Sequence, residues 1–237
     1  LATFVYTSGT TGHPKGAMIT HKNVLAVISA LDEMHWADEN DVAVAFLPLC
    51  HVFQRVAGHF FAMRAGIYTH YSEDFNSIVE DIQAKRPTVL LAVPRVCEKV
   101  YAKILGQARQ QAPWKQAVFN WAVGVGARYS QLKEQKQAIP FLLQLQYRIA
   151  YQMVFQKLRG ALGGRVRWMV AAGAPLAREI ADFFNAAQVF LIEGYGMTEC
   201  SAPATLNRLD EYKFGTAGKP LSCNQIRIAD DGEILIK

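Results

Sequence analysis

The sequence contains 237 residues, of which 51% are hydrophobic and 19% are charged, and its formal net charge is +5. These values describe an ordinary globular protein with an ample core, in one large α/β domain or two small ones. They argue against a membrane-spanning protein, because no apolar run reaches the roughly 18 residues that a spanning helix needs. The four widely separated cysteines form no Cys-x-x-Cys pair, which argues against a zinc site or a disulfide framework. The N-terminal residues lack a signal-peptide pattern, so we expect a cytoplasmic protein.

The secondary structure is predicted from apolar patterning. Short apolar runs predict strands at 2–7, 42–47, 67–71, 88–92, 166–171 and 189–191, and helical spacing predicts helices over 23–34, 53–64, 78–85, 95–107 and 176–186. Alternation of strand and helix predicts an α/β fold whose largely parallel sheet carries helices on both faces. In such sheets, ligands bind at the carboxyl ends of the strands.

Two regions depart from this alternation. Residues 113–160 predict two long helices, split near Ile139-Pro140, that form a helical insertion at about 109–163. After Gly215 the sequence predicts short strands joined by a turn at Asp230-Asp231-Gly232. We therefore predict an α/β domain over residues 1–214 and the start of a C-terminal β subdomain over 215–237, which the end of the sequence cuts short.

Positive charge is concentrated between residues 101 and 160. Nine basic side chains and one acidic side chain, Glu134, give this stretch a charge of +8 and leave −3 for the rest. A basic block of this kind serves nucleic acid, anionic lipid or an anionic cofactor. The basic residues are Lys103, Arg109, Lys115, Arg128, Lys133, Lys136, Arg148, Lys157 and Arg159.

The stretch YTSGTTGHPKGAM, residues 6–18, predicts a site for polyphosphate. It is not the P-loop of nucleotide hydrolases, because Pro14 stands where the second glycine belongs and Gly16 follows Lys15 in place of a hydroxyl residue. Its glycines allow successive N–H groups to converge on an anion, while the hydroxyls and the lysine add donors and charge. A plain surface turn before a helix near His21 is the alternative, but a turn needs only one or two glycines. The candidate phosphate-binding residues are Thr7, Ser8, Gly9, Thr10, Thr11, Gly12, Lys15 and Gly16.

Three further motifs follow predicted strands: LPLCHVF at 47–53, MVAAGAPL at 169–176 and GYGMTE at 194–199. Together with TSGTTGHPKG, in this order over essentially the whole chain, they resemble the adenylate-forming superfamily of acyl-CoA synthetases, luciferases and peptide-synthetase adenylation domains. The segment PRVCEKVYAKI at 94–104, followed by a basic helical insertion, looks most like the long-chain fatty acyl-CoA synthetases. The resemblance implies part of the large N-terminal domain of such an enzyme.

The resemblance also implies a reaction. ATP activates a long-chain fatty acid to an acyl-adenylate with release of pyrophosphate, and the thiol of coenzyme A then takes the acyl group. This chemistry requires that the triphosphate charge be neutralised while the carboxylate approaches in line, with Mg²⁺ as the accompanying ion.

The resemblance assigns roles to individual residues. Lys15 and the glycine-rich loop would hold the β- and γ-phosphates, and His51 would position the reacting carboxylate. Glu199 would bind Mg²⁺ directly or through water, with the hydroxyls of Thr7 and Thr198 near the ion and the α-phosphate. The ring of Tyr195 would face the adenine, whose other side the 173–175 backbone would line. The implied catalytic residues are His51, Thr198 and Lys15, the implied metal ligands are Thr7 and Glu199, and the further nucleotide-binding residues are Gly173, Ala174, Pro175, Glu193, Gly194, Tyr195, Gly196 and Thr198.

The sequence departs from the superfamily pattern in two places. Phe53 and Arg55 occupy the position where some relatives carry an aromatic gate to the fatty-acid tunnel, and arginine does not fit that pattern. The aspartate that holds the ribose, the hinge and the mobile domain with its catalytic lysine are missing, because the sequence stops within the motif that normally precedes them. We expect this chain to be a central portion that binds nucleotide without turnover.

Several alternatives remain open at this stage. One alternative is that the longer enzyme containing this chain passes the acyl group to a carrier protein, as a fatty acyl-AMP ligase or another adenylating enzyme would. Another alternative is that the chain is a non-catalytic nucleotide-binding module that releases no pyrophosphate. Nucleic acid is not an expected partner, because aromatic platforms interleaved with basic residues are not evident. The basic insertion, with its apolar stripes, predicts peripheral contact with an anionic membrane at its inner face. A basic surface that aids solubility or meets the phosphates of coenzyme A is the competing interpretation.

Overall fold

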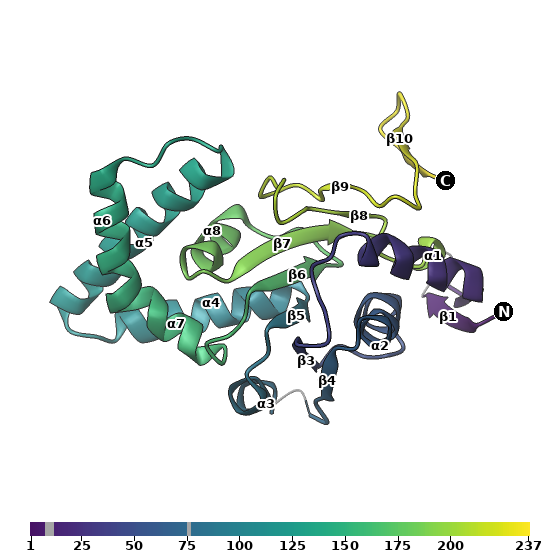
Figure 1. Ribbon diagram of the computed structural model, residues 1–237, viewed down its shortest axis with the longest axis horizontal. Helices are drawn as coiled ribbons and strands as arrows, with labels where there is room; N and C mark the ends of the chain where they lie inside the picture. Colours follow the sequence, from purple (N-terminus) through teal and green to yellow (C-terminus); the bar gives the residue numbers. More distant parts are fainter. Residues whose placement is uncertain (8–11, 75–76) are drawn as a thin grey trace.

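The structure is a computed structural model that describes residues 1–7, 12–74 and 77–237. A seven-stranded sheet with the order β4-β3-β5-β6-β7-β8-β9 forms its centre (Figure 1). The strands from β4 to β7 are parallel to their neighbours, and β8 and β9 are antiparallel. The strands are β3 Val42–Ala45, β4 Tyr68–Tyr71, β5 Val89–Ala92, β6 Trp168–Ala172, β7 Phe190–Tyr195, β8 Thr205–Leu206 and β9 Lys219–Pro220. The predicted α/β class with a largely parallel sheet is confirmed.

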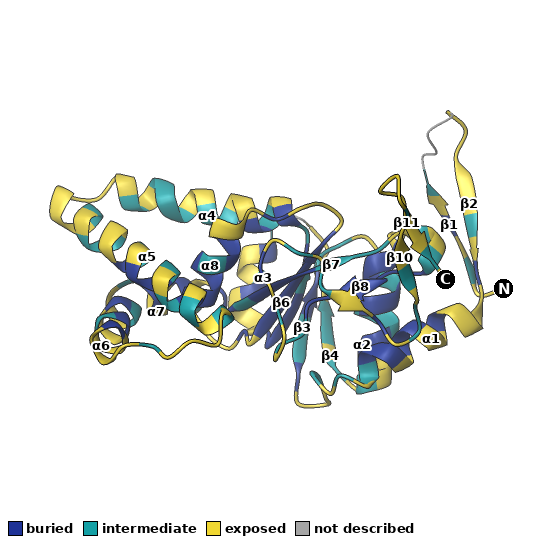
Figure 2. Ribbon diagram, turned by 90° about the horizontal axis from the view of Figure 1, so that it is seen from above, coloured by how far each residue is buried: buried dark blue, intermediate teal, exposed yellow. Residues whose placement is uncertain are grey.

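Helices cover both faces of this sheet (Figure 2). On one face lie α1 His21–Asp32, the π-helix η1 Phe53–Phe60 and α2 Phe61–Ala65. The other face carries α3 Ile78–Lys85, α4 Pro94–Arg109, α5 Pro113–Glu134, α6 Phe141–Ala150, the π-helix η2 Tyr151–Phe155, α7 Gln156–Ala161 and α8 Arg178–Ala186. Among the described residues, no helix is long and apolar enough to cross a membrane.

Strand β6 shows why the sheet must be covered twice. All five of its residues are buried. Trp168 and Val170 join the core beneath α1 and η1, whereas Met169 and Ala171 join the core beneath α5 and α8. Side chains alternate between the faces of a strand, so a continuous apolar run fits only a strand that is buried on both faces.

The helical insertion forms as its sequence predicts. Pro113 begins α5 and Pro140 precedes α6, positions at which a missing N–H and a fixed φ favour a helix start. Packing of α5 against both α6 and α8 joins the insertion to the sheet. At the other end of the chain, β10 Ile226–Ile228 and β11 Ile234–Ile236 form the expected hairpin, with Gly232 at φ +90° in its turn.

The first strand does not join the parallel sheet, which corrects the sequence prediction. β1 Thr3–Thr7 pairs antiparallel with β2 Lys15–Ile19, a strand that patterning did not predict, and the two form a separate hairpin. The run Lys15–Ile19 begins with a lysine and a glycine and buries only its last residue, Ile19. Too few of its side chains are buried to give a period-two pattern. Thr20 then caps α1, because its hydroxyl accepts the N–H of Asn23.

Asp41 ties the amino ends of three central strands together. Its side chain is 3% exposed, and both carboxylate oxygens accept hydrogen bonds from Arg167 at 2.7 Å. The hydroxyl of Thr88 donates to the same carboxylate at 2.5 Å. These three residues directly precede β3, β6 and β5. Burial disfavours ionisation of Asp41, but the hydrogen bonds from Thr88 and Arg167 outweigh it and hold the pKa of Asp41 below its ordinary value.

We predict that Asp41→Asn lowers the free energy of unfolding by about 2 kcal/mol at neutral pH, because charge-assisted hydrogen bonds at a buried site are lost. The folded-state pKa of Asp41 is depressed, so its contribution is present above the unfolded pKa of about 4 and is lost as pH falls through the folded value. Urea unfolding at several pH values measures both effects. The difference between wild type and variant should narrow in acid; a difference that is constant with pH would contradict the assignment.

Candidate active site

Two loops meet at the carboxyl edge of the sheet. β6 and β7 run in parallel, with Ala172 paired to Gly194. The residues that follow them, 173–175 and 196–199, therefore leave the same edge of the sheet side by side. The loop with His51 leaves β3 at this edge too, because β3 is parallel to β5 and β5 is parallel to β6. Three of the motifs predicted from the sequence are thus assembled in one region.

The loop after β6 presents bare backbone. Gly173, Ala174 and Pro175 are all exposed. Gly173 has φ +94°, and a Cβ built on it meets nothing within 4 Å. Glycine is therefore required here by conformation and not by crowding, and space remains beside the backbone for a ligand to approach.

The glycines around Tyr195 serve packing. A Cβ on Gly194 would lie 3.0 Å from a methyl group of Leu206, and one on Gly196 would lie 3.0 Å from the Cα of Pro203. Gly194 therefore lets β8 approach β7 closely, and Gly196 does the same for the segment that leads into β8. The ring of Tyr195 is half-buried beside them.

Thr198 and Glu199 lie on a short 3₁₀ helix, η3 Thr198–Cys200. Cys200 stabilises its start, because the N–H of Met197 donates to the Cys200 sulfur at 3.3 Å. Glu199 is exposed and Thr198 is half-buried. The carboxylate of Glu199 is therefore accessible to an ion from solvent.

The glycine-rich hairpin contacts this helix, since β2 lies against η3. Thr7 and Lys15 are paired across the hairpin, and the Thr7 hydroxyl lies 3.5 Å from the Lys15 carbonyl oxygen. Gly12 has φ +95°, with no atom within 4 Å of a built Cβ, and Gly16 packs beneath the Tyr6 ring. The predicted residues Ser8, Gly9, Thr10 and Thr11 lie outside the described residues.

Arg55 holds the His51 loop in place. Its Nε donates to the carbonyl oxygen of Leu49 at 2.7 Å, and its guanidinium also contacts the hydroxyl of Thr3 in β1. Arg55 therefore joins the loop after β3 to the glycine-rich hairpin. Sequence reasoning noted this arginine only as a departure at the acyl tunnel and missed its tethering role. The ring of His51 itself is exposed.

Glu193 is fully engaged by the protein. This buried carboxylate accepts the N–H of Leu176 at 3.1 Å through Oε1 and the N–H of Gly215 at 2.9 Å through Oε2. The sequence analysis placed Glu193 among the nucleotide-binding residues, whereas its described contacts are with backbone. A carboxylate inside the apolar strand FLIEGY requires internal partners, and that was the signal available from the sequence.

The donor set fits a magnesium ion that also binds phosphate. No group of three or more His, Cys, Asp or Glu side chains able to hold a metal occurs in the part of the chain that the structure describes. Mg²⁺ is usually bound through one or two carboxylates, waters and substrate phosphates, so a complete protein cage is not needed. Glu199 and Thr198 lie on η3, and Thr7 is paired with Lys15 at the start of β2, the strand that contacts η3; together they provide the oxygen donors of such a partial set.

A mostly parallel α/β sheet with a glycine-rich hairpin at its carboxyl edge is the architecture of part of the N-terminal domain of adenylate-forming enzymes. The chain belongs to the family AMP-binding enzyme, which matches residues 1–236. Long-chain-fatty-acid–CoA ligase FadD15 of Mycobacterium bovis is 34% identical over 240 residues, which cover 100% of this chain and 39% of that relative. Long-chain-fatty-acid–CoA ligase 5 of Mus musculus is 32% identical over 253 residues, which cover 100% of this chain and 35% of that relative.

A solved structure supports the fold. The inhibitor-bound N-terminal domain of FACL13 from Mycobacterium tuberculosis matches with a TM-score of 0.63 and 21% identity, over 98% of this chain and 46% of that one. At this identity the likeness concerns the fold alone. The chain spans 35–39% of the length of the two curated relatives.

We predict that Gly173→Ala lowers the stability of the chain by about 1–2 kcal/mol, because an L-residue is forced into a left-handed conformation. It should also weaken ATP binding severalfold, since the loop shifts to relieve that strain. Gly106→Ala is the matched control: Gly106 lies inside α4 with free space around a built Cβ, so alanine should raise stability by about 0.5–1 kcal/mol. Thermal unfolding and ATP titration of both variants provide the comparison. If Gly173→Ala and Gly106→Ala had the same thermal stability and the same affinity for ATP, the conformational role of Gly173 would be refuted.

Proposed function

We propose that the longer protein containing this chain is an ATP-dependent long-chain fatty acid–CoA ligase. It converts a fatty acid and ATP to an acyl-adenylate and pyrophosphate, and then transfers the acyl group to coenzyme A. The observation that carries the proposal is the contact of the glycine-rich hairpin with η3, beside the open backbone at Gly173. Family membership and the two ligase relatives support the same reaction.

The residues at the carboxyl edge suit the adenylation step. Lys15 provides a mobile positive charge for the phosphates, and the glycine-rich loop adds N–H and hydroxyl donors. Mg²⁺, when bound, neutralises charge on the phosphate oxygens. Glu199 would anchor the ion with the hydroxyls of Thr7 and Thr198, while His51 would hold the fatty acid carboxylate for attack on the α-phosphorus.

An apolar region between η1, α2 and the sheet suits the alkyl chain. Two cavities of about 30 Å³ each adjoin there, and both are lined by Ala57, Phe61, Leu91 and Trp168. Each is far smaller than the roughly 300–1,000 Å³ of a ligand pocket, so an alkyl chain enters only if side chains such as Phe53 and Phe61 move. We therefore assign this region to the acyl chain and the His51 loop to its carboxylate end.

Two rival functions are separated by direct assays on the full-length protein. A fatty acyl-AMP ligase would pass the acyl group to a carrier protein, so trapping of the acyl-adenylate with coenzyme A or with carrier protein identifies the acceptor. A non-catalytic module would bind ATP tightly without releasing pyrophosphate. The ligase proposal requires both pyrophosphate release and acyl-CoA formation.

We predict different effects for Lys15→Gln and Glu199→Gln in the full-length protein. Lys15→Gln should raise the KM for ATP about tenfold at saturating Mg²⁺, because a charge is lost from the phosphates. Glu199→Gln should mainly raise the Mg²⁺ concentration needed for half-maximal pyrophosphate release. Titration of Mg²⁺ at fixed ATP separates the two. An unchanged Mg²⁺ requirement in Glu199→Gln would show that the metal assignment is wrong.

We further propose a cytoplasmic protein that rests peripherally on the inner, anionic face of a membrane. An exposed apolar stripe runs along α6 and η2, where residues recur three or four positions apart. Its members, with exposed fractions in parentheses, are Phe141 (82%), Leu142 (64%), Leu145 (45%), Ile149 (43%) and Met153 (45%). Figure 2 shows this outer part of the insertion as largely exposed.

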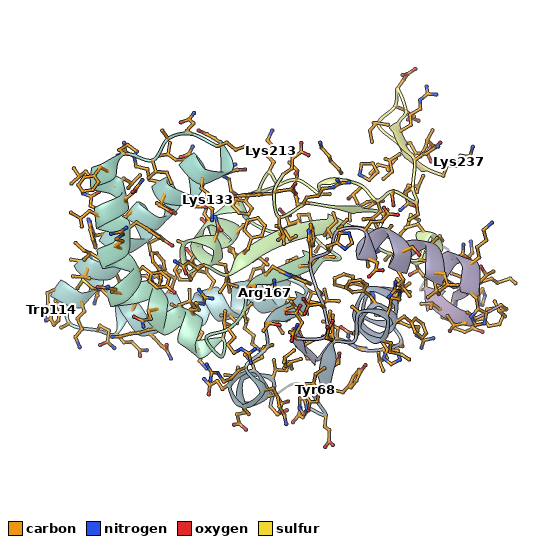
Figure 3. The ribbon with its side chains drawn as sticks, in the orientation of Figure 1. Tyr68, Trp114, Lys133, Arg167, Lys213 and Lys237 are labelled. Atoms are coloured by element: carbon orange, nitrogen blue, oxygen red, sulfur yellow. The ribbon has the colours of Figure 1, made fainter. Side chains whose placement is uncertain are left out.

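Charge around the stripe favours an anionic surface. Arg148 and Lys157 are exposed on the same run of helix, and no acidic residue occurs between positions 135 and 178. The one acidic residue of the basic block, Glu134, has a side chain that is 7% exposed and paired with Arg178. Trp114 and Lys133 lie at opposite ends of α5, so the charge of Lys133 is far from the ring of Trp114 (Figure 3).

We predict salt-sensitive binding of the full-length protein to vesicles that contain phosphatidylglycerol, but not to pure phosphatidylcholine vesicles. Each basic residue near such a surface contributes about 1 kcal/mol, so Arg148→Gln with Lys157→Gln should weaken binding about tenfold or more. Lys22→Gln with Lys85→Gln removes the same charge from α1 and α3 and is the control. If vesicle sedimentation showed the same loss of vesicle binding in both double variants, docking through α6 would be contradicted.

A further inference from the structure

Two buried or nearly buried glutamates bridge the same two segments of the chain. One segment, 176–178, follows the loop at Gly173, and the other is the pair Phe214-Gly215 after β8. Glu193 in β7 and Glu134 at the end of α5 each accept a backbone N–H from the second segment and bind a donor from the first. The two carboxylates thus form a double brace beside the candidate nucleotide loop.

Glu193 provides the inner half of this brace. It accepts the N–H of Leu176 at 3.1 Å and the N–H of Gly215 at 2.9 Å. Leu176 is the first residue after the exposed Gly173-Ala174-Pro175 loop and is itself buried, 5% exposed. Position 176 is therefore fixed by both a hydrogen bond and core packing, and this sets where the loop ends.

Glu134 provides the outer half. Its Oε1 accepts the N–H of Phe214 at 2.8 Å, and its Oε2 pairs with the guanidinium of Arg178, the first residue of α8. Asp182, one turn along α8, lies 3.5 Å from the same guanidinium. The last turn of α5, within the helical insertion, therefore holds the start of the helix that follows the nucleotide loop.

We propose that Glu193 and Glu134 are positioning residues for nucleotide binding, and that the helical insertion supports the nucleotide loop through Glu134. The inference rests on the proposed function, in which residues 173–175 face the nucleotide. Neither carboxylate reaches the ligand in this scheme; each fixes the backbone that does. ATP binding at the carboxyl edge of the sheet then depends on α5, although α5 lies far from β1 of the glycine-rich hairpin (Figure 1).

The brace requires two acceptors at each position. A glutamine offers one acceptor oxygen and turns an NH₂ group toward the second donor, so one of the two donors at each position loses its bond to the side chain. Glu193→Gln therefore keeps the size of the side chain while it breaks one half of the inner brace. Glu134→Gln does the same to the outer brace, at a position that is easier to alter without loss of folding because it lies at the end of a surface helix.

The test measures the dissociation constant for ATP by calorimetry on the full-length protein, together with fatty acid binding and thermal unfolding. Glu193→Gln should weaken ATP binding about tenfold, and Glu134→Gln should weaken it about threefold, with fatty acid binding unchanged within twofold. Asp41→Asn is the matched control. It removes a buried carboxylate that also joins separate segments, but at the opposite edge of the sheet, so it should lower thermal stability and leave ATP affinity unchanged.

The outcomes distinguish the inference from the proposed function. If both glutamine variants lose stability but bind ATP as the wild type does, as expected for Asp41→Asn, the positioning role is overturned. If Glu193→Gln does not fold, the ATP affinity of Glu134→Gln alone decides whether the positioning role holds. Wild-type protein that binds ATP but releases no pyrophosphate with any fatty acid contradicts the ligase function, while the comparison of ATP affinities still tests the brace.

Discussion

The parallel pairing of β6 with β7 is the constraint on which the candidate site depends. Because Ala172 lies opposite Gly194, the chain leaves both strands at the same edge and at the same height. The open backbone at Gly173 and the helix that carries Thr198 and Glu199 therefore become neighbours, although more than twenty residues separate them in the sequence. A slip of β6 by one residue would exchange Trp168 and Val170 with Met169 and Ala171, side chains of different size, so the packing of the two cores holds this register.

Around this pairing, charged groups position the backbone at both edges of the sheet. Asp41 joins the segments that enter β3, β5 and β6, and Glu193 joins the segments that leave β6 and β8. Arg55 connects the loop after β3 to the glycine-rich hairpin, which has no strand pairing with the main sheet among the described residues. The site is thus assembled by sheet register and then held by a few buried or half-buried ionic groups.

Much of the fold followed from sequence patterning, because continuous apolar runs such as 88–92 and proline helix starts such as Pro113 carry strong local signals. The strands that escaped prediction, β2, β8 and β9, bury few side chains or contain only two residues, and they form through tertiary pairing. In the candidate site, the motifs predicted which loops come together. They did not predict that Gly194 and Gly196 serve packing or that Glu193 binds backbone, because these roles depend on segments distant in sequence.

We propose that this edge of the sheet binds the ATP with which the full-length protein activates a fatty acid. The most direct measurement is exchange of labelled pyrophosphate into ATP by the full-length protein, dependent on Mg²⁺ and on a panel of fatty acids of different length. We predict exchange that requires a long-chain fatty acid and that is reduced strongly by Lys15→Gln. ATP binding without any fatty-acid-dependent exchange would contradict it.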